Sequence, residues 1–234
     1  MIDPSLRLRR AIHANDAVLV SRICKSHPPY LLHNPDISLR GLSNTSLHLA
    51  CSLGHLPVVR TLLALDHEAN GISLNEDHQT PLMVASAAGH TEIVHLLCKE
   101  CPESIARRDN RGRDAVIEAS RGGHDTCLQI LLTFAPGGPA NLLNNADIDG
   151  NTALHFASSN GHLLVLRTLL AAGADSERRN AWSWSAVSYS ATVQAEVYFR
   201  GLVAEIEKRK AARKEVEMKA TGVGGVRLVN GDDG

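Results

Sequence analysis

The sequence predicts an all-α protein, a solenoid of about six stacked helix-turn-helix units. Three observations lead to this prediction: a motif recurs at a period near 33 residues, residues that begin and end helices stand at the same place in each copy, and the apolar residues are mostly aliphatic. Because only 3% of the residues are aromatic, Leu, Val, Ile and Ala must fill the interior by close packing of helices.

Four copies of the motif align without gaps. They are TSLHLACSLGH (residues 45–55), TPLMVASAAGH (80–90), DAVIEASRGGH (114–124) and TALHFASSNGH (152–162). Two weaker copies flank them, at residues 8–16 and 185–195. No single copy can bury its own apolar stripe, so we expect the copies to stack in chain order.

Each copy carries the signals of a short first helix. A hydroxyl or carboxyl group that can cap the helix stands at Thr45, Thr80, Asp114 and Thr152. A glycine able to close the helix stands at Gly54, Gly89, Gly123 and Gly161. A second helix follows with an apolar stripe, and the polar stretches 109–113 and 147–151 are typical of tight hairpins between units.

The predicted solenoid covers residues 4–203. Its units lie near residues 4–36, 37–74, 75–108, 109–146, 147–179 and 180–203. Residues 204–220 are rich in helix formers with interleaved charges and predict a solvated helical extension, and residues 221–234 predict a disordered tail.

The copies at 45–55, 80–90 and 152–162 resemble the ankyrin repeat, with its T-P-L-H-x-A core and its Gly-His step. The resemblance implies that His48 and His155 hold neighbouring units together through hydrogen bonds. At 114–117 the chain has DAVI, which lacks this histidine, so we expect the fourth unit to be tied less firmly to its neighbour.

Composition excludes several classes of protein. The 24 Lys and Arg residues balance 25 Asp and Glu residues, so no global positive field exists to hold nucleic acid. No apolar run is long enough to cross a membrane, and the first ten residues lack the apolar core of a signal peptide. We therefore expect a chain of the cytosol or nucleus whose five cysteines stay reduced.

No catalytic or cofactor motif is present, so we expect neither enzyme activity, nor a cofactor, nor a metal site. Half of the twelve histidines fall on the motif and are spaced one repeat apart, too far to converge on one ion. Cys98 and Cys101 form a C-x-x-C, but Cys98 occupies the position of Leu63 one unit earlier. The pair is therefore interpreted as buried core thiols rather than as a redox or zinc motif.

What remains is a surface for protein binding, the concave face formed by hairpin tips and the exposed sides of the first helices. The predicted partner-binding residues on or beside it are Arg108, Arg111, Arg113, Arg121, Arg179, Trp182 and Trp184. Arg and Trp are enriched in binding hot spots, and this set favours a partner segment with acidic and apolar residues. An equally weighted alternative is that Trp182 and Trp184 cover the end of the stack.

The order of segments along some 200 residues, from PSLRLRRAI at the start to VYFRGLVAEIEKRK, is similar to the fungal ankyrin-repeat accessory subunits of target of rapamycin complex 2. That resemblance implies a non-enzymatic subunit of a kinase complex at the plasma membrane, with other kinase-complex subunits as partners. The alternative is an assembly chaperone for a ribosomal or proteasomal subunit, for which a basic client would require an acidic surface.

Overall fold

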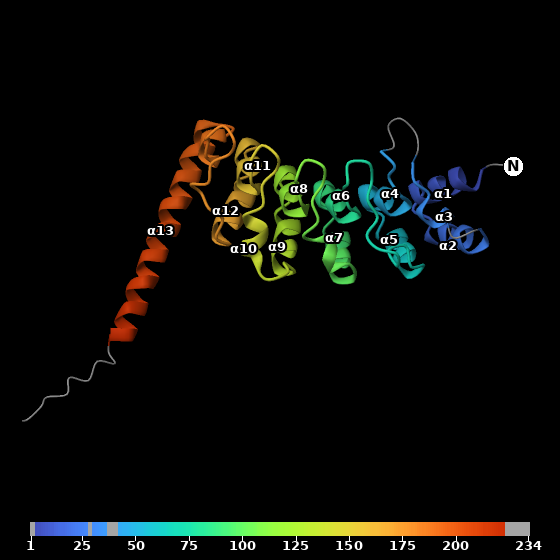
Figure 1. The fold of residues 1–234 in the computed structure, drawn as a ribbon, viewed down its shortest axis with the longest axis horizontal. Helices are drawn as coiled ribbons and strands as arrows, with labels where there is room; N and C mark the ends of the chain where they lie inside the picture. Colours follow the sequence, from blue (N-terminus) through green and yellow to red (C-terminus); the bar gives the residue numbers. More distant parts are fainter. Residues whose placement is uncertain (1–2, 28–29, 37–41, 223–234) are drawn as a thin grey trace, which may run out of the picture.

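The helices form a two-layered row in which the units follow one another in chain order (Figure 1). This computed structural model describes residues 3–27, 30–36 and 42–222. The inner layer contains α1 (Pro4–His13), α4 (Ser46–Leu53), α6 (Pro81–Ala88), α8 (Ala115–Gly122) and α11 (Ala153–Ser159). The outer layer contains α2 (Ala17–Ser26), α5 (Leu56–Ala64), α7 (Thr91–Glu100), α9 (Asp125–Thr133) and α12 (Leu163–Ala171), and α13 (Val193–Gly222) runs across the end of the row and extends beyond it (Figure 1).

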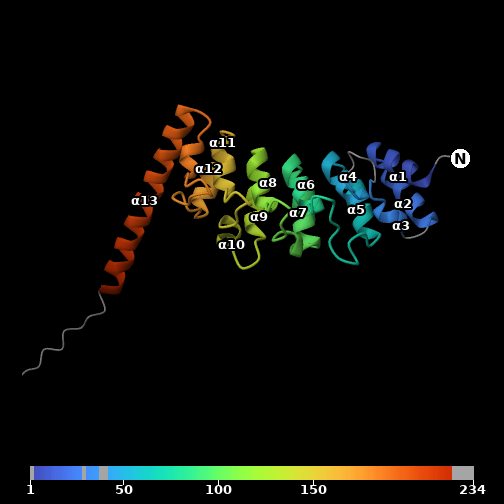
Figure 2. The same ribbon diagram turned by 45° about the horizontal axis from the view of Figure 1, so that its top comes forward.

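Four short elements complete the described chain. They are α3 (Tyr30–His33), α10 (Pro139–Leu143) and the 3-10 helices η1 (Pro102–Ser104) and η2 (Ala186–Tyr189). The view in Figure 2 shows α10 beside α9, outside the regular row. The predicted all-α solenoid is confirmed, and α3 and α10 lie in the two longest intervals between successive copies of the motif.

The inner helices begin at the predicted caps. The Thr80 hydroxyl accepts a hydrogen bond from the Met83 amide at 3.2 Å, and a carboxylate oxygen of Asp114 accepts one from the Ile117 amide at 2.9 Å. Each bond satisfies an amide that has no partner within the helix.

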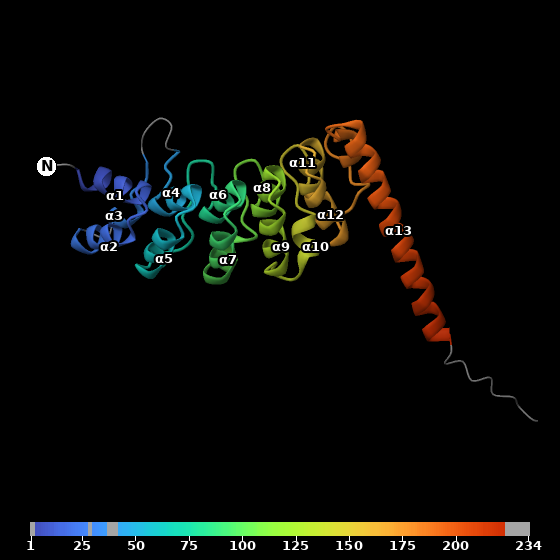
Figure 3. The ribbon, with the colours of Figure 1, turned by 180° about the vertical axis from the view of Figure 1, so that it is seen from behind.

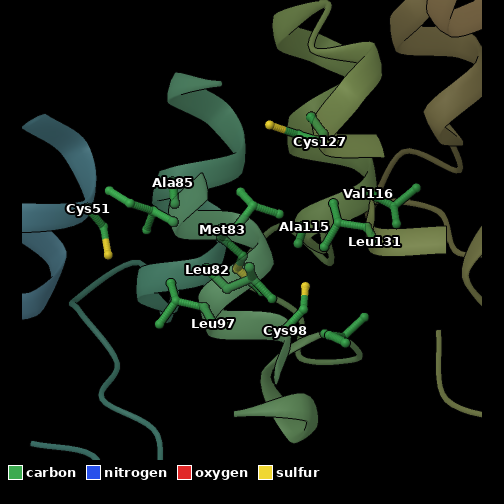
Figure 4. Close-up of a cluster of buried hydrophobic side chains, with 14 of the residues drawn as sticks. Cys51, Leu82, Met83, Ala85, Leu97, Cys98, Ala115, Val116, Cys127 and Leu131 are labelled. Carbon is green, nitrogen blue, oxygen red and sulfur yellow. The ribbon is translucent and has the colours of Figure 1, made fainter. Parts of the chain in front are cut away.

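The core is continuous from unit to unit, because each inner helix buries side chains against the next. Figure 4 shows one section of it, in which Leu82 and Met83 of α6 lie between Cys51 of the preceding unit and Val116 of the following one. All four side chains are at most 1% exposed. The apolar stripe of one unit is thus buried by its neighbours, as the repeat pattern predicts.

The Gly-His step fixes the spacing between units. The Nε2 atoms of His90, His124 and His162 each donate to a carbonyl of the preceding unit, those of Ser52, Ala87 and Arg121, all at 3.1 Å. Gly54 has a φ of 78°, and a Cβ there would lie 2.6 Å from the His90 ring. Glycine is therefore required at this position both by the backbone conformation and by the neighbouring ring.

The motif's other histidine, three residues after the capping residue, ties the inner helix to the next hairpin, as the resemblance implies. His48 Nε2 donates to the Gln79 carbonyl at 2.9 Å, and His155 Nε2 donates to the Trp184 carbonyl at 3.1 Å. On the other side of each ring, Nδ1 lies 2.9 Å from the hydroxyl of the capping residue, Thr45 or Thr152. One ring therefore both supports the helix start and couples two units.

The fourth unit has Ile117 in place of this histidine, and its capping residue Asp114 makes a different bond. Asn145 Nδ2 donates to the second carboxylate oxygen of Asp114 at 2.7 Å. Burial raises the pKa of Asp114, and the hydrogen bonds from Asn145 and Ile117 oppose that rise. The capping carboxylate thus connects the start of α8 to the end of the fourth unit.

The last unit departs from the expected helix pair. Its first element is the short 3-10 helix η2, since Ser and Val in SAVSYS are poor helix formers and Ser185 makes no capping bond. Its second helix and the predicted extension are one 30-residue helix, α13. Helix α13 passes the predicted boundary at residue 220 and ends at Gly222, and the rest of the predicted tail lies outside the described residues.

We expect the protein to lose stability as the pH falls from about 6.5 to about 4. Burial lowers the pKa of His48 to about 4, although its bond to the Gln79 carbonyl opposes the change. The unfolded chain binds a proton on this histidine below about pH 6.5, whereas the folded chain does not, so the free energy of unfolding drops by about 2 kcal/mol between pH 7.5 and pH 5 from this group.

Urea denaturation at the two pH values measures this drop. The His48→Gln variant removes the titrating ring, so its unfolding free energy should fall by about 2 kcal/mol less than that of the parent. His13→Gln, at an exposed position of α1, is the control. An equal drop in His48→Gln and in the parent would contradict the assignment.

Candidate functional site

Four hairpins between units share one construction. An Asn or Asp at the base accepts backbone amide hydrogen bonds from residues further along the hairpin, as in Asp109 Oδ1 from Arg111 and Arg113 at 2.9 and 2.8 Å. The corresponding base residues are Asn75, Asp147 and Asn180. The fourth residue of each hairpin has positive φ, from 58° to 77°, at His78, Gly112, Gly150 and Ser183. The side chain at the base thus fixes the turn.

The hairpins are also joined to one another. Each donates one backbone amide to a carbonyl of the preceding hairpin: Glu76 to Leu42 at 2.9 Å, Asn110 to Asp77 at 3.0 Å, Ile148 to Arg111 at 2.9 Å and Ala181 to Asp149 at 2.9 Å. Because these bonds and the base residues satisfy the backbone, the tips differ from one another mainly in their side chains. We use the name hairpin face for the surface made by the inner helices and by residues 75–79, 109–113, 147–151 and 180–184. This surface corresponds to the face that the sequence predicts to be concave.

An apolar and aromatic group lies at the C-terminal end of the hairpin face. Ile148 is 72% exposed, Trp182 55% and Trp184 53%. Trp184 contacts the ring of Tyr189, with the two centroids 5.3 Å apart, and the Tyr189 hydroxyl accepts a hydrogen bond from Asn180 at 2.8 Å. The tryptophan hairpin is therefore held in place while both indole rings remain half open to solvent.

The end of the stack is covered by α13, not by the tryptophans. Phe199 of α13 is fully buried and Ala195 is 5% exposed, and Leu202, Val203 and Ile206 pack against the core from the same helix. The alternative that Trp182 and Trp184 serve as a lid assumed that the end of the stack needs these side chains to cover it. Because α13 covers that end, this need does not arise.

Two of the predicted arginines belong to a buried charge network. Arg113 contacts Asp109 at 2.8 Å and Glu118 at 3.0 Å, and Arg121 contacts Glu118 at 2.6 Å. Both carboxylate side chains are 1% exposed. The two positive charges are therefore matched by two negative ones, so this part of the hairpin face is far less basic than its arginines suggest.

Sequence reasoning missed the acidic half of this network. Glu118 stands where the other units have Leu49, Val84 and Phe156 in the aligned motif, so a charge at an apolar register position was the available signal. Asp109, four residues before Arg113, was the second signal.

The other predicted arginines divide into bound and free side chains. Arg108 donates from Nε to the Gly112 carbonyl at 2.7 Å and from Nη2 to the Ala146 carbonyl. Arg179 donates from Nη1 to the Ser183 carbonyl at 2.8 Å. Among the described residues the Arg111 side chain makes no hydrogen bond or ion pair, and it is exposed at a hairpin tip beside Ile148. Of the five, Arg111 thus has the cation with the most capacity for a partner.

The thiols and histidines lie in structural positions. Burial raises the pKa of Cys98 to about 12 and that of Cys101 to about 11, which disfavours the reactive thiolate. Within the described ranges, no group of three or more His, Cys, Asp or Glu side chains is arranged to hold a metal ion. None of the helices in the same ranges is both long and apolar enough to span a bilayer.

Comparison with known proteins agrees with this architecture. A family model described as ankyrin repeats in three copies matches residues 9–109 and again residues 101–180. The target of rapamycin complex 2 subunit AVO2 of Saccharomyces cerevisiae is 28% identical over 210 residues, which cover 88% of this chain and 47% of the yeast protein.

Other relatives share the repeats over shorter stretches. The probable E3 ubiquitin-protein ligase XBOS32 of Oryza sativa subsp. japonica is 36% identical over 118 residues, covering 50% of this chain and 23% of the rice protein. The transcription factor MBP1 of Saccharomyces cerevisiae is 29% identical over 175 residues, covering 64% of this chain and 20% of the factor. The chain spans less than half the length of each of these three relatives.

The charge network yields a prediction about stability. Arg113→Ala leaves the buried carboxylates of Asp109 and Glu118 without their shared cation, and we expect a loss of about 3 kcal/mol in the free energy of unfolding. Arg111→Ala, in the same hairpin but with a free side chain, should change it by about 0.5 kcal/mol or less. Urea denaturation of the two variants gives the comparison, and equal values would show that the network does not stabilise the fold.

Proposed function

The chain belongs to the ankyrin-repeat family, and we propose that it is a non-enzymatic scaffold that binds a protein partner on its hairpin face. The observation that carries this proposal is the alignment of Arg111, Ile148 and Trp182 on three successive hairpins, exposed and on a fixed backbone. Rigid aromatic and aliphatic side chains lose little conformational freedom on binding, which favours affinity.

The partner segment on this surface is apolar with at least one carboxylate. Ile148 and Trp182 supply the apolar contact area, and Arg111 supplies a cation with unused donors at the adjacent tip. The compensation of Arg113 and Arg121 by Asp109 and Glu118 argues against a strongly acidic partner. Recognition at this end of the face therefore rests on shape and apolar area more than on charge.

We propose further that the chain is an accessory subunit of target of rapamycin complex 2. The support is the yeast subunit of that complex, whose similarity runs over 88% of this chain. In this role the partner is another subunit of the kinase complex, and the chain reaches the plasma membrane only through that complex.

A second candidate is an assembly chaperone for a ribosomal or proteasomal subunit. The observation in its favour is the acidic side chains of Glu76 and Asp77, both exposed on the hairpin of the third unit. A basic client would contact this end of the hairpin face, away from Trp182.

Affinity purification of the tagged chain from its own cells, followed by mass spectrometry, tests the proposal. We expect kinase-complex subunits to be recovered and to be lost in the Arg111→Ala/Trp182→Ala variant, since truncating one hot-spot side chain costs about 2 kcal/mol, or roughly thirtyfold in affinity. The matched control is Arg60→Ala/Leu164→Ala, which removes an exposed arginine and an exposed apolar side chain from the outer helices.

The outcomes separate the candidates. Capture that survives in Arg111→Ala/Trp182→Ala places the site elsewhere. Recovery of ribosomal or proteasomal subunits without kinase-complex subunits, and its loss in Glu76→Ala/Asp77→Ala, selects the chaperone. Thermal unfolding of each variant near the parent's midpoint confirms that lost capture reflects a lost contact.

A further inference from the structure

A groove lies on the outer layer between α2 and α5, the second helices of the first two units, which are side by side in both views of the row (Figures 1 and 3). Its volume is about 520 Å³, and its apolar lining comes from Ala17, Val18, Ala64 and Leu65. Three of these side chains are small or short, so the two helices leave space that larger residues would fill. Val18 is 70% exposed at its edge.

The groove is cationic. Arg22 and Lys25 of α2 line it, and none of the described residues that line it is a carboxylate. Both side chains are exposed, and neither makes an ion pair with another residue of the described chain.

The next grooves along the same layer differ in both respects. The groove between α5 and α7 has a volume of about 240 Å³, and its lining includes Leu63 and Leu96 together with both a carboxylate, Glu100, and a cation, Arg60. A groove reaching α9 also contains a carboxylate, Glu92. The groove between α2 and α5 is therefore larger than these two grooves, and its lining is more positively charged than theirs. Its positive charge is thus not a general property of the outer layer.

The walls of the groove restrict the form of an occupant. Both walls are helices whose backbone groups are bonded within the helix, so they offer no edge to which an extended segment could add as a strand. An occupant must satisfy its own backbone, which a helix does. Helix α2 has 10 residues, about 15 Å, and accommodates two to three turns alongside it.

We propose that this groove binds an acidic amphipathic helix of a protein partner, with its apolar edge on Val18 and Leu65 and its carboxylates paired with Arg22 and Lys25. The site lies on the outer layer, whereas the hairpin face lies on the inner layer (Figure 1). The chain would thus have two binding surfaces, and a partner on the hairpin face would not block the groove. The proposal for the groove does not depend on whether the hairpin face binds a partner.

A pair of synthetic peptides tests the proposal with the full chain. The acidic probe is a fluorescein-labelled 14-residue peptide with Leu at positions 2, 5, 6, 9 and 13 and Glu at the flanking positions on an Ala background; its partner has Lys in place of every Glu. Fluorescence anisotropy should show the acidic peptide binding at least tenfold more tightly, and weakening roughly tenfold between low and high salt. Its circular dichroism should report helix formation on binding.

Charge reversal provides the sharper comparison. Arg22→Glu/Lys25→Glu should invert the preference between the two peptides, and Val18→Asp should weaken the acidic peptide by about tenfold. The matched controls are Arg60→Glu/Lys99→Glu, with Arg60 lining the next groove from α5 and Lys99 on α7, and Val197→Asp, at a valine that is 66% exposed on α13. These controls should bind as the parent does.

Several results would overturn the proposal. They are no binding of the acidic peptide up to 1 mM, an unchanged preference in Arg22→Glu/Lys25→Glu, and equal losses in the control variants. Binding of phosphatidylserine vesicles that depends on Arg22 and Lys25, in place of peptide binding, would assign the groove to an anionic membrane instead. Concentration-dependent dimerisation abolished by the same charge reversal would assign it to a second copy of the chain.

Discussion

Burial of each unit's apolar stripe by the next unit is the constraint on which the rest of the structure depends. A single helix pair is too small to form a core, so Leu82 and Met83 are buried only because the units on either side supply Cys51 and Val116. The Gly-His step converts this requirement into a fixed spacing, because the His90 ring occupies the space over Gly54 and bonds to the carbonyl of Ser52. Stability and geometry therefore propagate along the row together.

The fixed spacing is what gives the hairpin face its regular geometry. Once two units are in register, the hairpin amides meet the carbonyls of the preceding hairpin, and the base residues Asp109, Asp147 and Asn180 close each turn from within. The backbone at the tips is then bonded internally, and variation is confined to side chains such as Arg111, Ile148 and Trp182. A partner would meet a surface that needs little ordering, which reduces the entropic cost of association.

Features governed by local chemistry could be predicted from the sequence, and features that depend on long side chains or missing neighbours could not. Thr80 and Asp114 cap helices because the capping bond spans three residues. By contrast, the pairing of Arg121 with Glu118 depends on how two flexible side chains meet, and the bond from Asn145 to Asp114 joins residues 31 positions apart. The merging of the last helix with the extension also escaped prediction, although no proline interrupts residues 193–222.

Charge balance is the clearest case in which composition and structure lead to different conclusions about binding. Counted along the chain, the arginines around the fourth unit suggest a basic surface. In the fold, Asp109 and Glu118 neutralise Arg113 and Arg121. A neutralised ion pair attracts a charged partner only weakly, so its main effect on binding is to fix the positions of neighbouring atoms. In the outer groove, Arg22 and Lys25 face no carboxylate among the described lining residues, so their field extends into solvent. The outer groove therefore presents two adjacent positive charges, whereas the arginines of the fourth unit at positions 113 and 121 are matched by buried carboxylates.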